Sequence, residues 1–162
     1  MGLEPFNVAS ALNLVLAQRL VRRVCGKCRE RYQPDAAEFS GAKVTADTKL
    51  RDLRFTPHAL ADAIGRAIPE QAPLLAGVTL DTPVGALPYW RGRGCDACNG
   101  TGLKGRQGLY ETMAMSAPLR RLILKGGDAQ QIKETAVDEG MLTLRMDGWL
   151  KVLKGITTLE QV

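Results

Sequence analysis

Two cysteine pairs, Cys25-Gly-Lys-Cys28 and Cys95-Asp-Ala-Cys98, constrain this chain more than any other feature of its sequence. They use all four cysteines, and 66 residues separate the first pair from the second. A Cys-x-x-Cys turn presents two sulfurs to one metal ion, and four thiolates satisfy the tetrahedral preference of zinc. We therefore predict a structural zinc site made by all four cysteines, which joins the two ends of a long loop.

Two other interpretations of the cysteines stay open: disulfides or redox motifs, and four unrelated buried thiols. A thioredoxin-like redox pair needs a βαβ pattern around one Cys-x-x-Cys motif, and neither pair shows that pattern. The chain opens without a basic and apolar leader, so we expect a reducing compartment, where paired thiols bind metal more often than they form disulfides. We therefore expect a cytoplasmic protein.

The net charge of +5 is concentrated beside the cysteine pairs. Residues 19–31 carry six basic side chains and one acidic one, and a second basic group, Arg91, Arg93, Lys104 and Arg106, surrounds the second pair. Nearby cations stabilise thiolates, and the remaining charge offers a surface for an acidic protein, lipid headgroups or phosphate. Few aromatic side chains accompany these cations, so we expect no nucleic-acid partner.

Apolar spacing predicts a mainly helical α+β fold. Residues 8–24 have apolar side chains at three- and four-residue steps, which predicts a helix with Asn7 or Ser10 as its N-cap. Six of the eight prolines fall within residues 33–88, which predicts short elements joined by turns, including a strand over 78–84. A helix over 58–68 is expected before that strand, with Thr56 as N-cap and Pro57 at its first position.

The last third of the chain has the clearest helix signals. A strand is expected over residues 107–113, and helices are expected after Ser116, Asp128 and Thr143. Gln131, three residues after Asp128, completes a capping box. We call the turns at Cys25–Cys28 and Cys95–Cys98 the first and second knuckle. The closely spaced glycines after Cys98 predict that the second knuckle is a tight turn whose backbone N–H groups point at sulfur.

Three segments in collinear order resemble one family: Ala17-Gln-Arg-Leu-Val-Arg-Arg-Val-Cys25, then Gly94-Cys95 to Tyr110-Glu111, then residues 140–148 with 155–160. They are similar to the C-terminal region of the type II secretion and type IV pilus assembly ATPases, the GspE/PilB family. The resemblance implies a fragment of a larger RecA-like ATPase. Its parts would be a helix over 1–24 continuing from an absent core, a zinc subdomain over 25–106 inserted before the helical bundle, and a strand with C-terminal helices over 107–162.

The resemblance also implies what the parent protein does. It would be a cytoplasmic hexameric motor that uses ATP and Mg²⁺ to drive pilin or pseudopilin assembly through an inner-membrane platform protein, with peripheral membrane association through partners. The family's zinc ligands map onto the four cysteines. The long stretch between the two pairs departs from the family's pattern.

No catalytic residue is expected in this fragment. A phosphate-binding loop needs Gly-Lys followed by Ser or Thr, and the only Gly-Lys here, Gly26-Lys27, precedes Cys28. The fragment would therefore act in structure and partner docking. Two alternatives stay open: a DnaJ-type zinc chaperone module, which needs more Cys-x-x-Cys-x-Gly-x-Gly repeats than the one here, and a nucleic-acid-binding zinc module.

Overall fold

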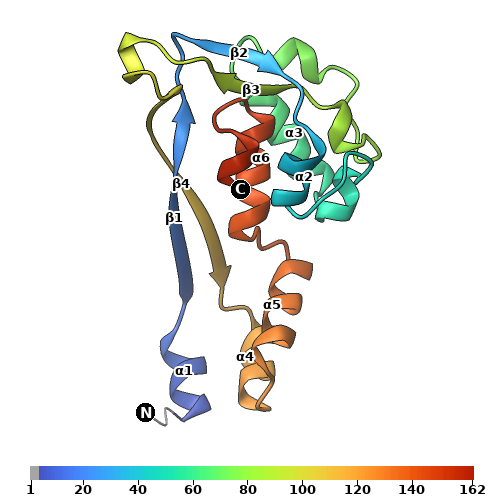
Figure 1. The fold of residues 1–162 in the computed structure, drawn as a ribbon. Coiled ribbons are helices and arrows are strands. Elements are labelled where there is room, and N and C mark those ends of the chain that lie inside the picture. The colour runs from blue at the N-terminus through green and yellow to red at the C-terminus, as the bar shows by residue number, and fades with distance from the viewer. Residues whose placement is uncertain (1–3) are drawn as a thin grey trace. The chain divides into compact units, whose positions relative to one another are not determined.

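The computed structural model describes residues 4–162, which contain six α-helices and two two-stranded sheets (Figure 1). The predicted α+β class is therefore confirmed. The chain forms two compact units. Unit 1 combines the segment up to Arg19 with residues 110–144, and unit 2 combines residues 20–109 with 145–162.

Unit 1 contains three helices: α1 (Pro5–Ala11), α4 (Ala117–Leu124) and α5 (Ala129–Asp138). It also contains the first part of β1 (Leu14–Val24) and the last part of β4 (Leu103–Ala114), and these two strands pair with each other. The Arg120 guanidinium, on α4, donates to the carbonyl oxygens of Ala9 and Leu12 and so ties α4 to the end of α1. Leu119, Ala136 and Met141 form the buried core of this unit.

The helix signals of unit 1 are confirmed. Ser116 Oγ accepts the N–H of Leu119 at 3.2 Å and begins α4. Asp128 accepts the N–H of Gln131 at 2.8 Å, and the Gln131 side chain accepts the N–H of Asp128 at 3.1 Å. This reciprocal pair is the predicted capping box.

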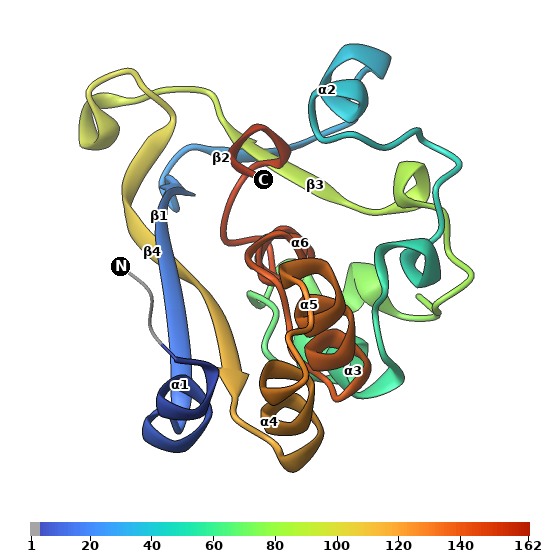
Figure 2. The same cartoon turned by 90° about the horizontal axis from the view of Figure 1, so that it is seen from below.

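Unit 2 contains a second sheet, in which β2 (Arg29–Tyr32) runs antiparallel to β3 (Tyr89–Gly92). Figures 1 and 2 show these two strands side by side. Its helices are α2 (Ala36–Gly41), α3 (Pro57–Gly65) and nearly all of α6 (Leu144–Leu153), and α3 begins with the predicted Thr56 cap and Pro57. Unit 2 also contains short 3₁₀ turns, at Leu50–Leu53, Ala72–Leu75, Val84–Ala86, Asp96–Cys98 and Leu159–Gln161.

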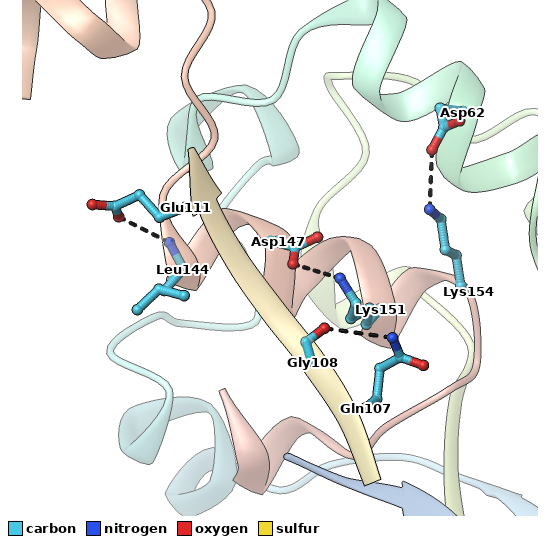
Figure 3. Close-up of polar contacts among 8 residues, drawn as sticks. All are labelled: Asp62, Gln107, Gly108, Glu111, Leu144, Asp147, Lys151 and Lys154. Carbon is cyan, nitrogen blue, oxygen red and sulfur yellow. Dashed lines mark hydrogen bonds and ion pairs between the residues drawn. The ribbon is translucent and has the colours of Figure 1, made fainter. Parts of the chain in front are cut away.

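Polar side chains fix α6 within unit 2 (Figure 3). Lys154 Nζ donates to Asp62 Oδ2 of α3 at 3.0 Å, and Lys151 pairs with Asp147 one turn earlier on α6. Gln71 is fully buried and donates to the carbonyl oxygens of Pro88 and Leu153 at 3.1 and 2.8 Å. A buried amide with these partners joins the loop before β3 to the end of α6.

The predicted helix over residues 1–24 is confirmed only over Pro5–Ala11 and is wrong for residues 14–24. α1 ends at Ala11, its N-cap is Glu4 rather than Asn7 or Ser10, and residues 14–24 form β1. Residues 1–3 of that prediction lie outside the described residues. The β-branched side chains of this segment favour a strand once a partner is available, and β4 supplies the partner.

The predicted strand over residues 78–84 is also wrong. The Thr82 hydroxyl accepts the N–H of Thr79 at 2.9 Å, so this segment turns on itself. Its single bridge joins Lys49 to Pro83. Within residues 4–162, no helix has both the length and the apolar character needed to cross a membrane. The predicted strand over 107–113 is confirmed as part of β4.

Candidate metal centre

The structure brings all four predicted cysteines together in unit 2. Their Sγ atoms all lie within 4.8 Å of one another. Cys25 and Cys28 flank the turn between β1 and β2, whereas Cys95 precedes the 3₁₀ turn Asp96–Cys98 and Cys98 ends it. Three of the side chains are buried and Cys95 is half-buried.

The sulfur spacing fits a tetrahedral zinc ion. The Sγ–Sγ distances are 3.9 Å for Cys25 and Cys95, 3.8 Å for Cys28 and Cys98, and 3.7 Å for Cys95 and Cys98. A zinc–sulfur bond of about 2.3 Å places the sulfurs of a tetrahedral site about 3.8 Å apart. A disulfide would require a separation of about 2.0 Å, so the four cysteines are free thiols. The donor set and its spacing are consistent with structural zinc.

Glycines make the second knuckle possible. Gly94, Gly100 and Gly102 have positive φ angles of 94°, 75° and 70°, in the region where a Cβ is disfavoured. A Cβ on Gly92 would collide with the carbonyl oxygen of Gly102, so the backbone of β3 and that of the knuckle cross at closer range than side chains allow. The predicted tight turn is therefore present.

Backbone N–H groups also donate hydrogen bonds to a cysteine sulfur, as the glycine pattern predicts. The N–H groups of Cys95 and Gly102 both donate to Cys98 Sγ at 3.2 Å. Burial raises the pKa of Cys98, but these two backbone donors and the side-chain hydrogen bonds with Cys95 and Cys28 together lower it to about 6. Burial raises the pKa of Cys28 to about 12, so Cys98 presents a thiolate more readily than Cys28 does.

Much of the basic charge near the cysteines has acidic partners. Arg29 pairs with Glu70, and both Arg91 and Arg93 pair with Glu30 at 3.1 Å. The sequence shows Glu30 beside Arg29, but the contact with Glu70 spans 41 residues and has no local signal. The basic surface is therefore smaller than the sequence alone indicates.

Sequence reasoning missed the segment that lies beside the first knuckle. The N–H of Val24 donates to the carbonyl oxygen of Ile156 at 2.9 Å, and the N–H of Arg22 donates to Gln161 Oε1 at 3.0 Å. Thr157 Oγ1 donates to the carbonyl oxygen of Arg22 at 2.7 Å. The last residues of the chain thus support the end of β1 immediately before Cys25.

The fold and the four sulfurs define a small α+β chain with a tetracysteine centre of the kind that binds zinc. Residues 1–162 match the family model described as "Type II/IV secretion system protein". The chain therefore belongs to this family, and the resemblance that the sequence motifs indicate is confirmed.

Three relatives illustrate the match. The chain is 39% identical to "Type IV pilus assembly ATPase PilB" of Thermus thermophilus and 34% identical to the protein of the same name in Myxococcus xanthus. It is 33% identical to "Type II secretion system protein E" of Pseudomonas aeruginosa. All three alignments cover the whole of this chain, but it spans only 14%, 23% and 25% of the respective relatives.

Proposed function

We propose that this chain is the zinc-binding C-terminal part of a cytoplasmic motor ATPase that powers pilin or pseudopilin assembly. The match over all 162 residues to proteins named as pilus assembly ATPases carries this proposal. Cys25, Cys28, Cys95 and Cys98 would hold the zinc ion. The ion would supply no catalytic chemistry, and would fix the end of β1 and the start of β2 against the second knuckle.

The parent protein would contain a RecA-like core that binds ATP and Mg²⁺ and assembles as a hexamer. The lengths of the relatives support this proposal, since this chain spans a quarter or less of each of the three. Unit 1 exposes large apolar side chains, among them Phe6, Leu14, Leu16 and Tyr110, which suits packing against polypeptide outside this chain. The predicted subdomain boundaries, 25–106 between 1–24 and 107–162, stay part of this proposal.

The metal centre would act in docking to the machinery, with an inner-membrane platform protein as the partner and with peripheral membrane association through it. Among residues 4–162, Arg31 has no acidic partner, whereas Arg29, Arg91 and Arg93 have internal ones. A substitution of Arg31 therefore tests a basic docking surface without breaking an internal ion pair.

The docking role predicts that Arg31→Glu weakens binding to the cytosolic part of the platform protein while zinc content stays unchanged. The loss should shrink as salt rises, because exposed charges are screened over about 10 Å at roughly 0.1 M ionic strength. The control is Lys43→Glu, which makes the same charge reversal at an exposed residue away from the cysteines. Equal binding by the Arg31 variant and the control at low salt would remove the docking role.

The motor role is tested in the full-length parent. Cys25→Ser and Cys95→Ser should impair pilus assembly or secretion more than nucleotide binding, because the cysteines would hold the fold of this part rather than the nucleotide. The 162-residue chain alone should not hydrolyse ATP, since it lacks a phosphate-binding loop motif. Magnesium-dependent turnover by this chain, or normal assembly by a zinc-free parent, would show that the proposed division of roles is wrong.

A further inference from the structure

A cavity of about 200 Å³ lies in unit 2 next to the second knuckle. Gly102, whose N–H donates to Cys98 Sγ, lines one wall. The side chains that carry its chemistry come from three separate segments of the chain: Tyr32, Glu38, Arg91, Thr158 and Glu160. None of them has a part in the metal centre.

Thr158 is a buried polar residue without a hydrogen bond. It is only 7% exposed, and within residues 4–162 its Oγ1 has no partner. The neighbouring hydroxyl of Thr157, in contrast, donates to the carbonyl oxygen of Arg22 at 2.7 Å. Buried hydroxyls nearly always have a partner, because an unpaired one loses its hydration without compensation. Oγ1 is itself buried, so a ligand in the cavity would supply the missing hydrogen bond after a rotation of the Thr158 side chain.

The two carboxylates of the cavity differ in what they already bind. Glu38 is occupied, because Oε1 accepts the Tyr32 hydroxyl at 3.1 Å and Oε2 accepts the N–H of Asp35 at 3.0 Å. Glu160 forms no hydrogen bond or ion pair with any residue from 4 to 162. Burial and the negative charges of Glu38 and Glu160 raise the pKa of Tyr32, which indicates that both charges act at the same ring.

The positive charge in the cavity is already balanced from outside it. The Arg91 guanidinium lies 5.2 Å from the centre of the Tyr32 ring, and its Nε pairs with Glu30 at 3.1 Å. Glu30 does not line the cavity. The cavity therefore has an excess of negative charge, with Glu160 as its available carboxylate, on a chain whose net charge is positive.

We propose that this cavity binds the charged end of a lysine or arginine side chain presented by a protein partner. Glu160 would be the charge partner, and the Thr158 hydroxyl would accept one of the N–H donors of the cation. A metal ion suits the site less well, because among the described residues only the four cysteines form a cluster with metal-ligand spacing. The cavity volume is of the size that one long side chain fills.

The binding site depends on the segment that supports the first knuckle. Thr158 and Glu160 lie between Ile156 and Gln161, which are hydrogen-bonded to Val24 and Arg22. The site needs no nucleotide and no parent ATPase. Its test can therefore fail while the proposed motor role stands, and the reverse is also true.

The experiment is an NMR titration of the ¹⁵N-labelled 162-residue chain, purified with its metal, with three short peptides. Acetyl-Gly-Lys-Gly-amide and acetyl-Gly-Arg-Gly-amide carry the cation, and acetyl-Gly-norleucine-Gly-amide is the neutral control of similar length. At least one cationic peptide should shift the amide signals of Thr158, Glu160 and Gly102 saturably, and the neutral peptide should not. Equal shifts with the neutral peptide, or no saturable shift with either cation, would overturn the proposal.

Two substitutions separate binding from folding. Glu160→Gln should weaken binding of the cationic peptide roughly threefold to fivefold, because Glu160 is exposed, and Thr158→Val, which keeps the side-chain shape, should weaken it roughly threefold. Asp47→Asn removes an exposed carboxylate outside the cavity and should leave the affinity unchanged. The spectra of all three variants should otherwise match that of the parent chain. Unchanged affinity in the Glu160 variant would refute the site.

Discussion

Removing the metal should destabilise the chain by an amount that follows from the position of the cysteines. The two pairs lie 66 residues apart, so a shared ion acts as a cross-link between distant parts of the chain. If the ion acts like a covalent cross-link, a loop of this length contributes about 4 kcal/mol to the free energy of unfolding. For a chain of this size, each kcal/mol corresponds to about 2–4 °C, so the melting temperature should fall by roughly 8–16 °C.

The assay combines metal analysis with thermal unfolding. Protein purified without chelator should contain about one zinc ion per chain, and a strong chelator should lower the melting temperature, because metal-binding energy is folding energy. Returning zinc should restore it. Cys28→Ser and Cys95→Ser should each cause a similar loss, and the double variant should lose little more, because both residues serve one ion.

Three results would refute a shared structural ion. They are a zinc content below about half an equivalent, a melting temperature that does not respond to chelation, and a serine variant of one pair that behaves like the unaltered chain. The last result would mean that only one pair holds the metal. The Sγ atom of Cys25 lies next to that of Cys95, and the Sγ atom of Cys28 lies next to that of Cys98. The structure therefore predicts that neither pair alone is sufficient to hold the metal.

Three further predictions follow from local features. Gly102→Ala should lower zinc content, because Gly102 has a φ of 70° and a Cβ there would meet the Gly92 backbone, whereas Gly26→Ala, which faces open space, should not. Thr56→Ala removes the cap of α3 and should lower the free energy of unfolding by about 1 kcal/mol in a urea titration; no change in midpoint would contradict it. The hydrogen bond from Lys154 lowers the pKa of Asp62 from its usual 3.8, so this interaction stabilises the fold above that pH and is lost as the pH falls below it. Lys154→Met should therefore reduce the loss of stability between pH 5 and 3, measured by chemical unfolding, and an unchanged pH profile would contradict this.

The features that could be predicted from the sequence depend on interactions within a few residues. The caps at Thr56, Ser116 and Asp128 join a side chain to a backbone N–H three positions later, so the complete interaction is visible in a short stretch. The cluster of four cysteines was predictable for a different reason. A tetrahedral zinc site requires four thiolates, and the chain contains four cysteines in two pairs. The residue type alone therefore predicts the cluster, although the two pairs lie far apart in the sequence.

β1 shows why the remaining features could not be predicted in this way. A half-buried strand alternates apolar and polar side chains, but β1 has leucines exposed at positions 14, 16 and 20 and buries only Val21 and Val24. Apolar residues on both faces of a strand form a run that also matches helical spacing. The deciding interaction lies far away, since β1 pairs with β4 and Arg22 Nη2 donates to the carbonyl oxygen of Leu103, 81 positions later. If the proposed ATPase core covers both faces of β1 in the longer protein, this strand needs apolar side chains on both faces. The same cover would then explain the ambiguous apolar run and the leucines that are exposed in this chain.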